Sequence, residues 1–362
     1  MNKTLSKAVL TIVFSLASLS ANAEYTLSWL DGLGGAALTS QALSINGSGQ
    51  IVGYSSTADG STHATVWNNG VPTDLGTLGG TLSVAYKINA SGQIVGYSST
   101  ADGSIRATVW NNGVPNALTT RGGTLTEAFD INASGQIVGN SDSANGYNHA
   151  TVWNNGVPTD LGTLGGSYSY ASGINASGQI VGYSSTADGS IRATVWNNGV
   201  PTDLGTLGGS ISGAYDINAS GQIVGSSLTN EGSYEHATLW NNGVPTDLGS
   251  ASVATSINAS GQIVGFSYNG TAPTSAMLWY GTYKIDLNNF ISDSEKASGW
   301  MLNKALGIND YGSIVGVAYN GTIQRGFLLS VTPVPEADSS AMLLTGLGVI
   351  GFMVRRRKNI QA

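Results

Sequence analysis

Ile45-Asn46-Gly47-Ser48-Gly49-Gln50-Ile51-Val52-Gly53 is the stretch that decides the fold of this chain, because close copies of it return at near-regular intervals. The copies start at Ile88, Ile131, Ile174, Ile217, Ile257 and Ile308, so successive starts lie 43, 43, 43, 43, 40 and 51 residues apart. A period of this size indicates a repeat architecture built from one supersecondary unit. Most of the matching residues are therefore expected to be framework rather than functional site.

One repeat, residues 167–209, predicts four short strands. The expected strands are residues 170–174, 179–184, 191–196 and 200–204. They are separated by Asn-Ala-Ser-Gly, Thr-Ala-Asp-Gly and Asn-Asn-Gly segments, whose residues favour tight turns. Four antiparallel strands in about 43 residues are typical of a β-propeller blade. A helical turn is expected only near residues 292–304.

The two ends of the repeat region complement each other. The seventh repeat stops after Leu329 without a fourth strand, while residues 25–35 resemble the closing segment of a repeat, residues 203–209. An N-terminal strand that completes the last blade would leave no open sheet edge. We therefore expect an all-β fold over residues 24–331, a seven-bladed β-propeller of four-stranded antiparallel blades closed by the N-terminal strand. A parallel β-helix is the alternative, although its coils are usually shorter and would not need a split repeat.

The composition restricts the class of partner. Charged residues make up 10% of the chain, and Gly accounts for 51 of 362 residues, as expected for many tight turns and few exposed strands. Residues 24–331 contain 8 Lys or Arg against 19 Asp or Glu. With this excess of acidic residues, the region lacks the basic surface that binding to nucleic acid or to an anionic membrane requires. The absence of Cys excludes disulfides and thiolate metal sites.

Residues 1–23 have the order of a secretory signal peptide. Lys3 and Lys7 precede an apolar run over residues 8–19, and Ala21 and Ala23 form an A-x-A cleavage site. A buried helix is the alternative interpretation.

Residues 332–362 have the order of a second targeting signal. Pro335-Glu336-Ala337 is followed by an apolar segment, residues 341–354, and then by Arg355, Arg356, Arg357 and Lys358. The apolar segment predicts a short hydrophobic helix, shorter than the roughly 20 residues of a full membrane span, with the basic tail held in the cytoplasm.

This tail resembles the PEP-CTERM sorting signal of Gram-negative bacteria that make exopolysaccharide, with Ala337 where the family has Pro. The resemblance implies transient membrane anchoring, processing by an exosortase, and release or transfer to the cell surface. An ordinary C-terminal anchor is the alternative. The repeats resemble the HAF-repeat family of bacterial extracellular proteins, since His63-Ala64-Thr65-Val66-Trp67 matches its defining motif with Thr in place of Phe. That resemblance implies a cell-surface location and no enzymatic activity.

Repeated polar positions are interpreted as framework. His63, His149 and His236 share one position with Arg106, Arg192, Arg325 and Ser275, so a shared role as hydrogen-bond donor is expected. No carboxylate was found to accompany the His residues at fixed spacing, and no metal site is predicted. The recurring Asp74, Asp160, Asp203 and Asp247 are expected to accept backbone N–H bonds in turns. The recurring Trp residues are expected to pack between blades, with sugar stacking as the alternative.

The variable loops give the best pointer to a binding surface. Alternating strand directions place the Asn-Ala-Ser-Gly and Asn-Asn-Gly turns on one face and residues 142–148, 228–235, 269–274 and 292–300 on the other. Binding residues concentrate on variable loops of a rigid scaffold, although unconstrained drift would give the same pattern. The candidate ligand-binding residues are Trp300, Tyr147, Tyr234, Asp293 and Glu295.

The sequence thus predicts a secreted cell-surface or matrix-associated protein with a non-catalytic binding or structural role, with exopolysaccharide as the expected partner. No catalytic residue, cofactor or metal ligand is predicted. A polysaccharide-degrading lyase or glycosidase is the alternative; it would need two non-repeated carboxylates in one cleft. A third alternative is a matrix filler without a specific ligand.

Overall fold

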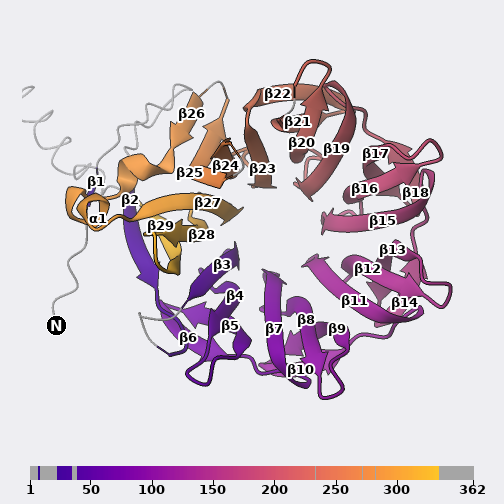
Figure 1. Cartoon of the computed structure of the whole chain (residues 1–362), viewed down its shortest axis with the longest axis horizontal. Coiled ribbons are helices and arrows are strands. Elements are labelled where there is room, and N and C mark those ends of the chain that lie inside the picture. The colour runs from indigo at the N-terminus through magenta and orange to yellow at the C-terminus, as the bar shows by residue number, and fades with distance from the viewer. Residues whose placement is uncertain are drawn as a thin grey trace, which may run out of the picture.

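β-strands provide nearly all the regular structure of this chain. The computed structural model describes residues 7–8, 23–34, 39–232, 234–270, 272–281 and 283–333. Within these ranges the strands pair antiparallel in consecutive sets of four, and Figure 1 shows the sets arranged around a common axis. The predicted all-β class is confirmed, and the arrangement is that of a β-propeller.

Each set uses its four strands in the predicted order. The first strands are β3 (Ser40–Ile45), β7 (Gly79–Ile88), β11 (Gly122–Ile131), β15 (Gly165–Ile174), β19 (Gly208–Ile217), β23 (Ser252–Ile257) and β27 (Met301–Ile308). The second strands are β4 (Ile51–Ser56), β8 (Ile94–Thr100), β12 (Ile137–Ser143), β16 (Ile180–Thr186), β20 (Ile223–Thr229), β24 (Ile263–Asn269) and β28 (Ile314–Tyr319).

The outer half of each set follows the same pattern. The third strands are β5 (Thr62–Asn68), β9 (Ile105–Asn111), β13 (Asn148–Asn154), β17 (Ile191–Asn197), β21 (His236–Asn241), β25 (Ala272–Tyr280) and β29 (Gln324–Pro333). The fourth strands are β6 (Val71–Asp74), β10 (Val114–Ala117), β14 (Val157–Asp160), β18 (Val200–Asp203), β22 (Val244–Ser250), β26 (Tyr283–Asp286) and, for the last set, β2 (Ala23–Leu30).

The N-terminal strand pairs with the end of the repeat region. β2 is antiparallel to β29 over its whole length, from Ala23 opposite Pro333 to Leu30 opposite Gly326. In Figure 1 the indigo β2 lies beside the orange and yellow strands of the last set. β1 (Lys7–Ala8) pairs with β2 at Thr26 and Tyr25. The predicted pairing of the N-terminal segment with the seventh repeat is therefore confirmed.

A hydrogen-bonded ring explains why the Ile-Asn motif recurs. In the turn after each first strand, the Asn side-chain oxygen accepts main-chain N–H groups within its own turn, as Asn175 does from Ser177 at 3.1 Å and from Gln179 at 3.0 Å. The Asn amide donates to the main-chain carbonyl of the equivalent Asn in the next set. The successive donors are Asn46, Asn89, Asn132, Asn175, Asn218, Asn258 and Asn309, and Asn309 donates back to Asn46. These buried amides are thus satisfied both locally and between sets.

The recurring Trp residues pack between neighbouring sets, as predicted. Trp67, Trp110, Trp153, Trp196 and Trp240 have no exposed surface, and Trp279 is 3% exposed. Trp110, for example, packs against Val52 and Ala64 of the preceding set. A buried Trp removes on the order of 200 Å² from water, so these side chains are a main source of cohesion between sets.

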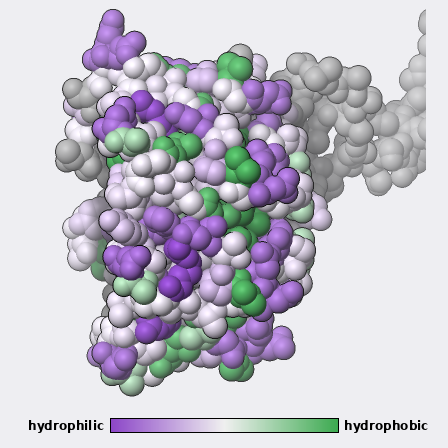
Figure 2. Space-filling model, turned by 90° about the vertical axis from the view of Figure 1, so that its right-hand side faces the viewer, coloured by the Kyte–Doolittle hydropathy of each residue, from purple (hydrophilic) through white to green (hydrophobic). Residues whose placement is uncertain are grey.

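The fourth strands form blunt outer edges. Most have four residues and begin with Val-Pro. Because the strands are short and Pro has no N–H to donate, these edges pair poorly with strands of other chains. The Val side chains are exposed, as at Val157 (64%) and Val200 (63%). Figure 2 shows hydrophobic residues on this side scattered among hydrophilic ones rather than gathered in one patch.

The expected helical turn lies between β26 and β27. Within the expected range, residues 292–304, it is the helix α1 (Asp293–Ala297), which begins with a capping box between Ser292 and Glu295. The 3-10 helix η1 (Leu287–Phe290) precedes that range, and strand β27 already begins at Met301. In the part of the chain that the structure describes, no helix has the length and apolar character needed to cross a membrane. The predicted apolar helix at residues 341–354 lies outside the described residues.

Candidate functional site

The invariant turns are joined to one another on one face. Gln50 donates to the Asn68 side-chain oxygen at 3.1 Å, and Gln136 and Gln179 donate in the same way to Asn154 (2.9 Å) and Asn197 (3.1 Å). Each bond links the turn after a first strand to the turn after a third strand. The remaining loops, which carry the sequence-predicted binding residues, consequently emerge on the opposite face, called here the variable face.

Trp300 lines a pocket of about 410 Å³ on the variable face. Its other lining residues include Ser275, Asp286, Asn288 and Lys296, so an aromatic ring is combined with hydrogen-bonding groups. Trp300 also packs against Trp29 of β2, with ring centroids 4.7 Å apart, and against the core of the last set. The side chain is therefore partly structural as well as accessible to a ligand.

Glu295 and Asp293 occupy the helix beside that pocket. Glu295 accepts a hydrogen bond from the Trp29 indole N–H at 2.9 Å and from Ser292 in the capping box. Its carboxylate is thus engaged in holding α1 against β2. Asp293 is exposed in the first helical turn, and neither acid lines the Trp300 pocket.

Tyr147 borders a second, open groove of about 550 Å³ between the sets β11–β14 and β15–β18. Tyr147 is 53% exposed, and its ring stacks beside His149 at 6.3 Å. Tyr168, Ser167, Ser185 and Thr186 lie on the other side of the groove. Aromatic rings facing hydroxyl groups are suited to a sugar, which offers both C–H faces and hydroxyls.

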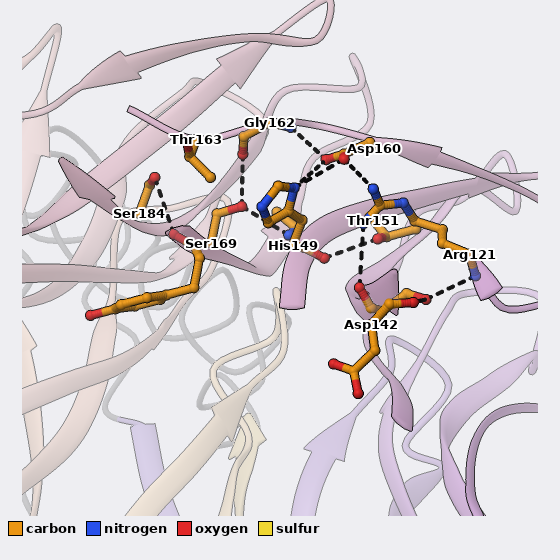
Figure 3. A network of polar contacts seen from close by, with 12 residues as sticks. Arg121, Asp142, His149, Thr151, Asp160, Gly162, Thr163, Ser169 and Ser184 are labelled. Carbon is orange, nitrogen blue, oxygen red and sulfur yellow. Dashed lines mark hydrogen bonds and ion pairs between the residues drawn. The ribbon is translucent and has the colours of Figure 1, made fainter. Parts of the chain in front are cut away.

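A polar network supports one wall of this groove (Figure 3). Asp160 accepts hydrogen bonds from the Gly162 N–H at 2.8 Å and from His149 Nδ1 at 3.0 Å. Arg121, which replaces the Leu of other repeats, forms a further ion pair with Asp160 and bonds to the Ser141 carbonyl. The ring of His149 is therefore held in place beside Tyr147.

The predicted binding residues do not form one site. Tyr147 and Trp300 line separate pockets, and Tyr234, which is 52% exposed in the loop between β20 and β21, lines neither of them. What they share is the variable face. The predicted cleavage-site residue Ala21 and the sorting residues Pro335 to Arg357 lie outside the described residues, while Ala23 begins β2.

The His position is paired with a carboxylate, which corrects the sequence prediction that no acid accompanies it. His63 bonds to Asp74, eleven residues later in the chain, at 2.7 Å. The same contact is made by His149–Asp160, His236–Asp247, Arg192–Asp203, Ser275–Asp286 and Arg325–Asp31. The donor role is confirmed, and Asp74 also accepts the Gly76 N–H, as predicted. Among the described residues, no three His, Asp or Glu side chains converge to hold a metal ion.

A charged cluster on the axis was missed from sequence. Lys87, Asp130 and Asp216 line a central pocket of about 250 Å³ formed by the ends of the first strands. The Lys87 ammonium lies 3.9 Å from a carboxylate oxygen of each Asp. These residues occupy the position directly before Ile-Asn, where other repeats have Ser or Gly. That variation beside an invariant motif was the signal available in the sequence.

Burial shapes the electrostatics of this axial cluster. Burial raises the pKa of Asp130 to about 6, partly opposed by Lys87 and by the N–H groups of Ile174 and Ile131. Burial lowers the pKa of Lys87, but the two carboxylates outweigh it and raise that pKa to about 12. Asp216 accepts hydrogen bonds from Ser256 and from the N–H groups of Ile217 and Ile257. The cluster therefore ties distant sets together across the axis.

This chain is similar to several solved structures, each at low sequence identity. TolB from Acinetobacter baumannii has a TM-score of 0.46 and 14% identity over 78% of this chain, which spans 63% of TolB. A triple arginine-to-alanine mutant of AofleA from Arthrobotrys oligospora has a TM-score of 0.41 and 14% identity, over 73% of this chain and 90% of AofleA. The six-bladed Aleuria aurantia lectin, described with a fucose recognition mode, has a TM-score of 0.38 and 11% identity, over 83% of this chain and 97% of the lectin. No curated protein matches the chain in sequence.

The C-terminal segment matches a family model. Residues 333–358 match the PEP-CTERM protein-sorting motif, in agreement with the sequence resemblance. This motif is a substrate signal for exosortase processing and directs export. The chain therefore ends in a PEP-CTERM sorting signal, which marks the protein for export to the cell envelope or surface.

Proposed function

We propose that this protein is a secreted, surface- or matrix-associated module that binds exopolysaccharide or another matrix glycan through its variable face, without catalysing a reaction. The observation that carries the proposal is the pairing of predicted aromatic residues with pockets on that face. Trp300 and Tyr147 each border a space of suitable size for a small ligand, among hydroxyl, amide and charged groups. The PEP-CTERM signal supports a location where such glycans occur.

We infer that residues 24–331 form one seven-bladed propeller, closed by the N-terminal strand and built from variant HAF-type repeats. The inference is supported by the Asn ring, in which the bond from Asn309 to Asn46 repeats the bonds between neighbouring sets. In this proposal residues 1–23 are a signal peptide removed on export. Residues 332–362 act as the sorting segment, which anchors the chain transiently in the membrane until the exosortase acts.

Binding of the organism's own exopolysaccharide to the exported protein tests the proposal. Tyr147→Ala and Tyr234→Ala should weaken binding at an unchanged melting temperature, because both side chains are more than half exposed. Trp300→Leu keeps apolar contact with Trp29 but removes the stacking surface, so it should weaken binding with a small loss of stability. Val157→Thr, beside an invariant turn on the opposite face, is the matched control. If binding survives these variants but is lost in the Val157 control, the site lies on the face of the Asn-Asn-Gly turns and the proposed variable-face site is refuted.

The enzyme alternative would need two non-repeated carboxylates in one cleft, and Asp130 and Asp216 are two such acids that line one pocket. We infer a structural role for both, because each accepts main-chain N–H bonds and lies beside Lys87 at the narrow axial pocket. A glycosidase acid and base would have to face a bound sugar chain. Depolymerisation of the same exopolysaccharide, measured as a fall in viscosity, would support the enzyme instead.

A further inference from the structure

Glu127 is the only acid at its position on the first strands. Cross-strand pairing fixes this position in each set, because Glu127 faces Asn140 just as Val84 faces Tyr97 and Tyr170 faces Tyr183. The equivalent residues of the other sets are Gln41, Val84, Tyr170, Gly213, Val253 and Lys304. The repeat framework therefore does not require a carboxylate here.

The two sets on either side of Glu127 carry aromatic residues on their first and second strands, the strands nearest the axis in Figure 1. We call Tyr86, Tyr97, Phe129, Tyr170 and Tyr183 the axial aromatic cluster. On one side the ring of Tyr86 lies 5.7 Å from Tyr97 and 5.2 Å from Phe129. On the other side Tyr170 and Tyr183 stack at 4.9 Å with an interplanar angle of 21°. All five side chains are half-buried, as is Glu127, so each keeps some surface for a ligand.

The Glu127 carboxylate is partly desolvated, and no cationic side chain of the described residues pairs with it. Burial raises its pKa, and the neighbouring Asn140 amide opposes that rise in part. After burial, Glu127 is the next cause that raises the pKa of both Tyr97 and Tyr170, so its charge acts on both halves of the cluster. No Lys, Arg or His in the described ranges forms a salt bridge with it. Desolvating a carboxylate is costly unless a partner compensates it.

The chemistry of this cluster matches a cation attached to an apolar face. Ring faces attract ammonium groups, and a carboxylate adds a charge-assisted hydrogen bond when the ammonium carries N–H donors. A pyranose with a free amine offers both the cation and the C–H face that stacks on a ring. The acidic balance of residues 24–331, 8 Lys or Arg against 19 Asp or Glu, also favours approach of a polycation.

We propose that Glu127 and the axial aromatic cluster bind the protonated amine of an amino sugar, as found in a deacetylated polysaccharide. This inference rests on the proposed glycan-binding function and names a ligand class for a second site, separate from the Trp300 and Tyr147 pockets.

Calorimetric titration of the exported protein with two matched probes tests it: a tetramer of β-1,4-linked glucosamine and the corresponding N-acetylglucosamine tetramer. The glucosamine tetramer should bind at least about tenfold more tightly, and Glu127→Gln should raise its Kd by about tenfold or more. Tyr170→Leu should also weaken binding. Asp310→Asn is the control: it removes the same charge from an exposed turn on the opposite face, keeps the acceptor for the Ala259 N–H, and should leave the Kd unchanged.

Several outcomes overturn the proposal. Equal binding of both tetramers would show that the amine is not recognised. An equal loss of affinity in Asp310→Asn would show that the attraction is non-specific. Displacement by tetramethylammonium at comparable concentration would indicate a quaternary-ammonium cage instead of an amino-sugar site. A melting temperature for Glu127→Gln near that of the parent excludes unfolding as the cause of lost binding. If Glu127→Gln weakens binding while Tyr147→Ala and Trp300→Leu do not, this site is upheld and the proposed variable-face pockets are refuted.

Discussion

The side-chain amide of Asn309 donates a 3.2 Å hydrogen bond to the main-chain carbonyl of Asn46, 263 residues earlier in the chain. The same bond joins Asn175 to Asn218 at 3.3 Å between consecutive repeats. The contact between the two ends of the repeat region is therefore chemically equivalent to its internal contacts. This equivalence makes the ring testable by comparing variants at the junction with variants inside it.

Asn309→Ala should destabilise the protein about as much as Asn175→Ala, by roughly 2 kcal/mol each. Both changes remove two turn bonds from main-chain N–H groups and leave a buried carbonyl without its partner. Asn175→Ala also removes the side-chain bonds of Asn175 with Ser177 and Gln179, so it should be the slightly more costly of the two. Urea unfolding of the two variants measures the difference. If Asn175→Ala lowers the free energy of unfolding but Asn309→Ala does not, the bond between Asn309 and Asn46 is absent in solution.

Deletion of residues 25–31 should expose the edge of β29 and cause aggregation or loss of cooperative melting. The deletion removes the strand that covers β29 and the buried Tyr25, Leu27 and Leu30. Calorimetry and light scattering report the two effects. Unchanged melting would refute the proposed closure by the N-terminal strand.

Lys87→Met should destabilise the protein by about 3 kcal/mol at neutral pH, because two carboxylates at the axis lose their shared cation. Asp130 already has a pKa raised to about 6, above its ordinary 3.8, so the folded chain holds this proton more tightly than the unfolded chain. Its contribution to stability consequently increases as the pH falls from about 6 toward 4.

The deficit of Lys87→Met should accordingly shrink between pH 7 and pH 5, as measured by denaturant unfolding. Lys284→Met, at an exposed position, serves as the control and should show little deficit at either pH. A deficit that stays constant with pH would mean that the cost is one of packing and not of charge.

Ala117→Asp should stabilise the protein by about 0.5 kcal/mol, with the gain reduced at high salt. Ala117 stands where other repeats have the acid, while the partner Arg106 is present and donates to the main-chain carbonyls of Ile105 and Thr124. Arg192 shows the complete arrangement, with its Nε 3.6 Å from Asp203 and a further bond to the Ser210 carbonyl. The gain should vanish in the double variant Arg106→Ala/Ala117→Asp.

The exported protein should lack everything beyond about Pro335, since the PEP-CTERM motif directs exosortase processing. Replacing Arg355 to Lys358 by neutral residues should block this step. Intact-mass measurement of the surface form decides the matter. A mature protein that retains Phe352 would have an ordinary membrane anchor.

The sequence predicted the strands and the Asn turn well because both are local and repeated. Gln, Ser and Gly around Asn175 form their bonds within five residues, so a single repeat contains the information. The bond from Asn175 to Asn218 could not be predicted in the same way, because it depends on the spacing between sets.

The candidate sites were only partly predictable for the same reason. The exposed loop positions of Tyr147 and Tyr234 follow from variation between repeats. The convergence of Lys87 with Asp216 joins non-neighbouring repeats across the axis, and the His63–Asp74 pair was overlooked because each position was compared by itself. A search for paired positions eleven residues apart would have found the latter.

The pairing of β2 with β29 also has a consequence for secretion. A chain that crosses a membrane N-terminus first delivers β2 before all other strands of the propeller, and its partner β29 last. The last sheet cannot be completed until translocation reaches Thr332, immediately before the sorting motif that begins at Pro333. Since Glu24 lies opposite Thr332, the first and last residues of the finished sheet lie side by side. Completion of the last sheet and delivery of the sorting motif are thus linked in time and place.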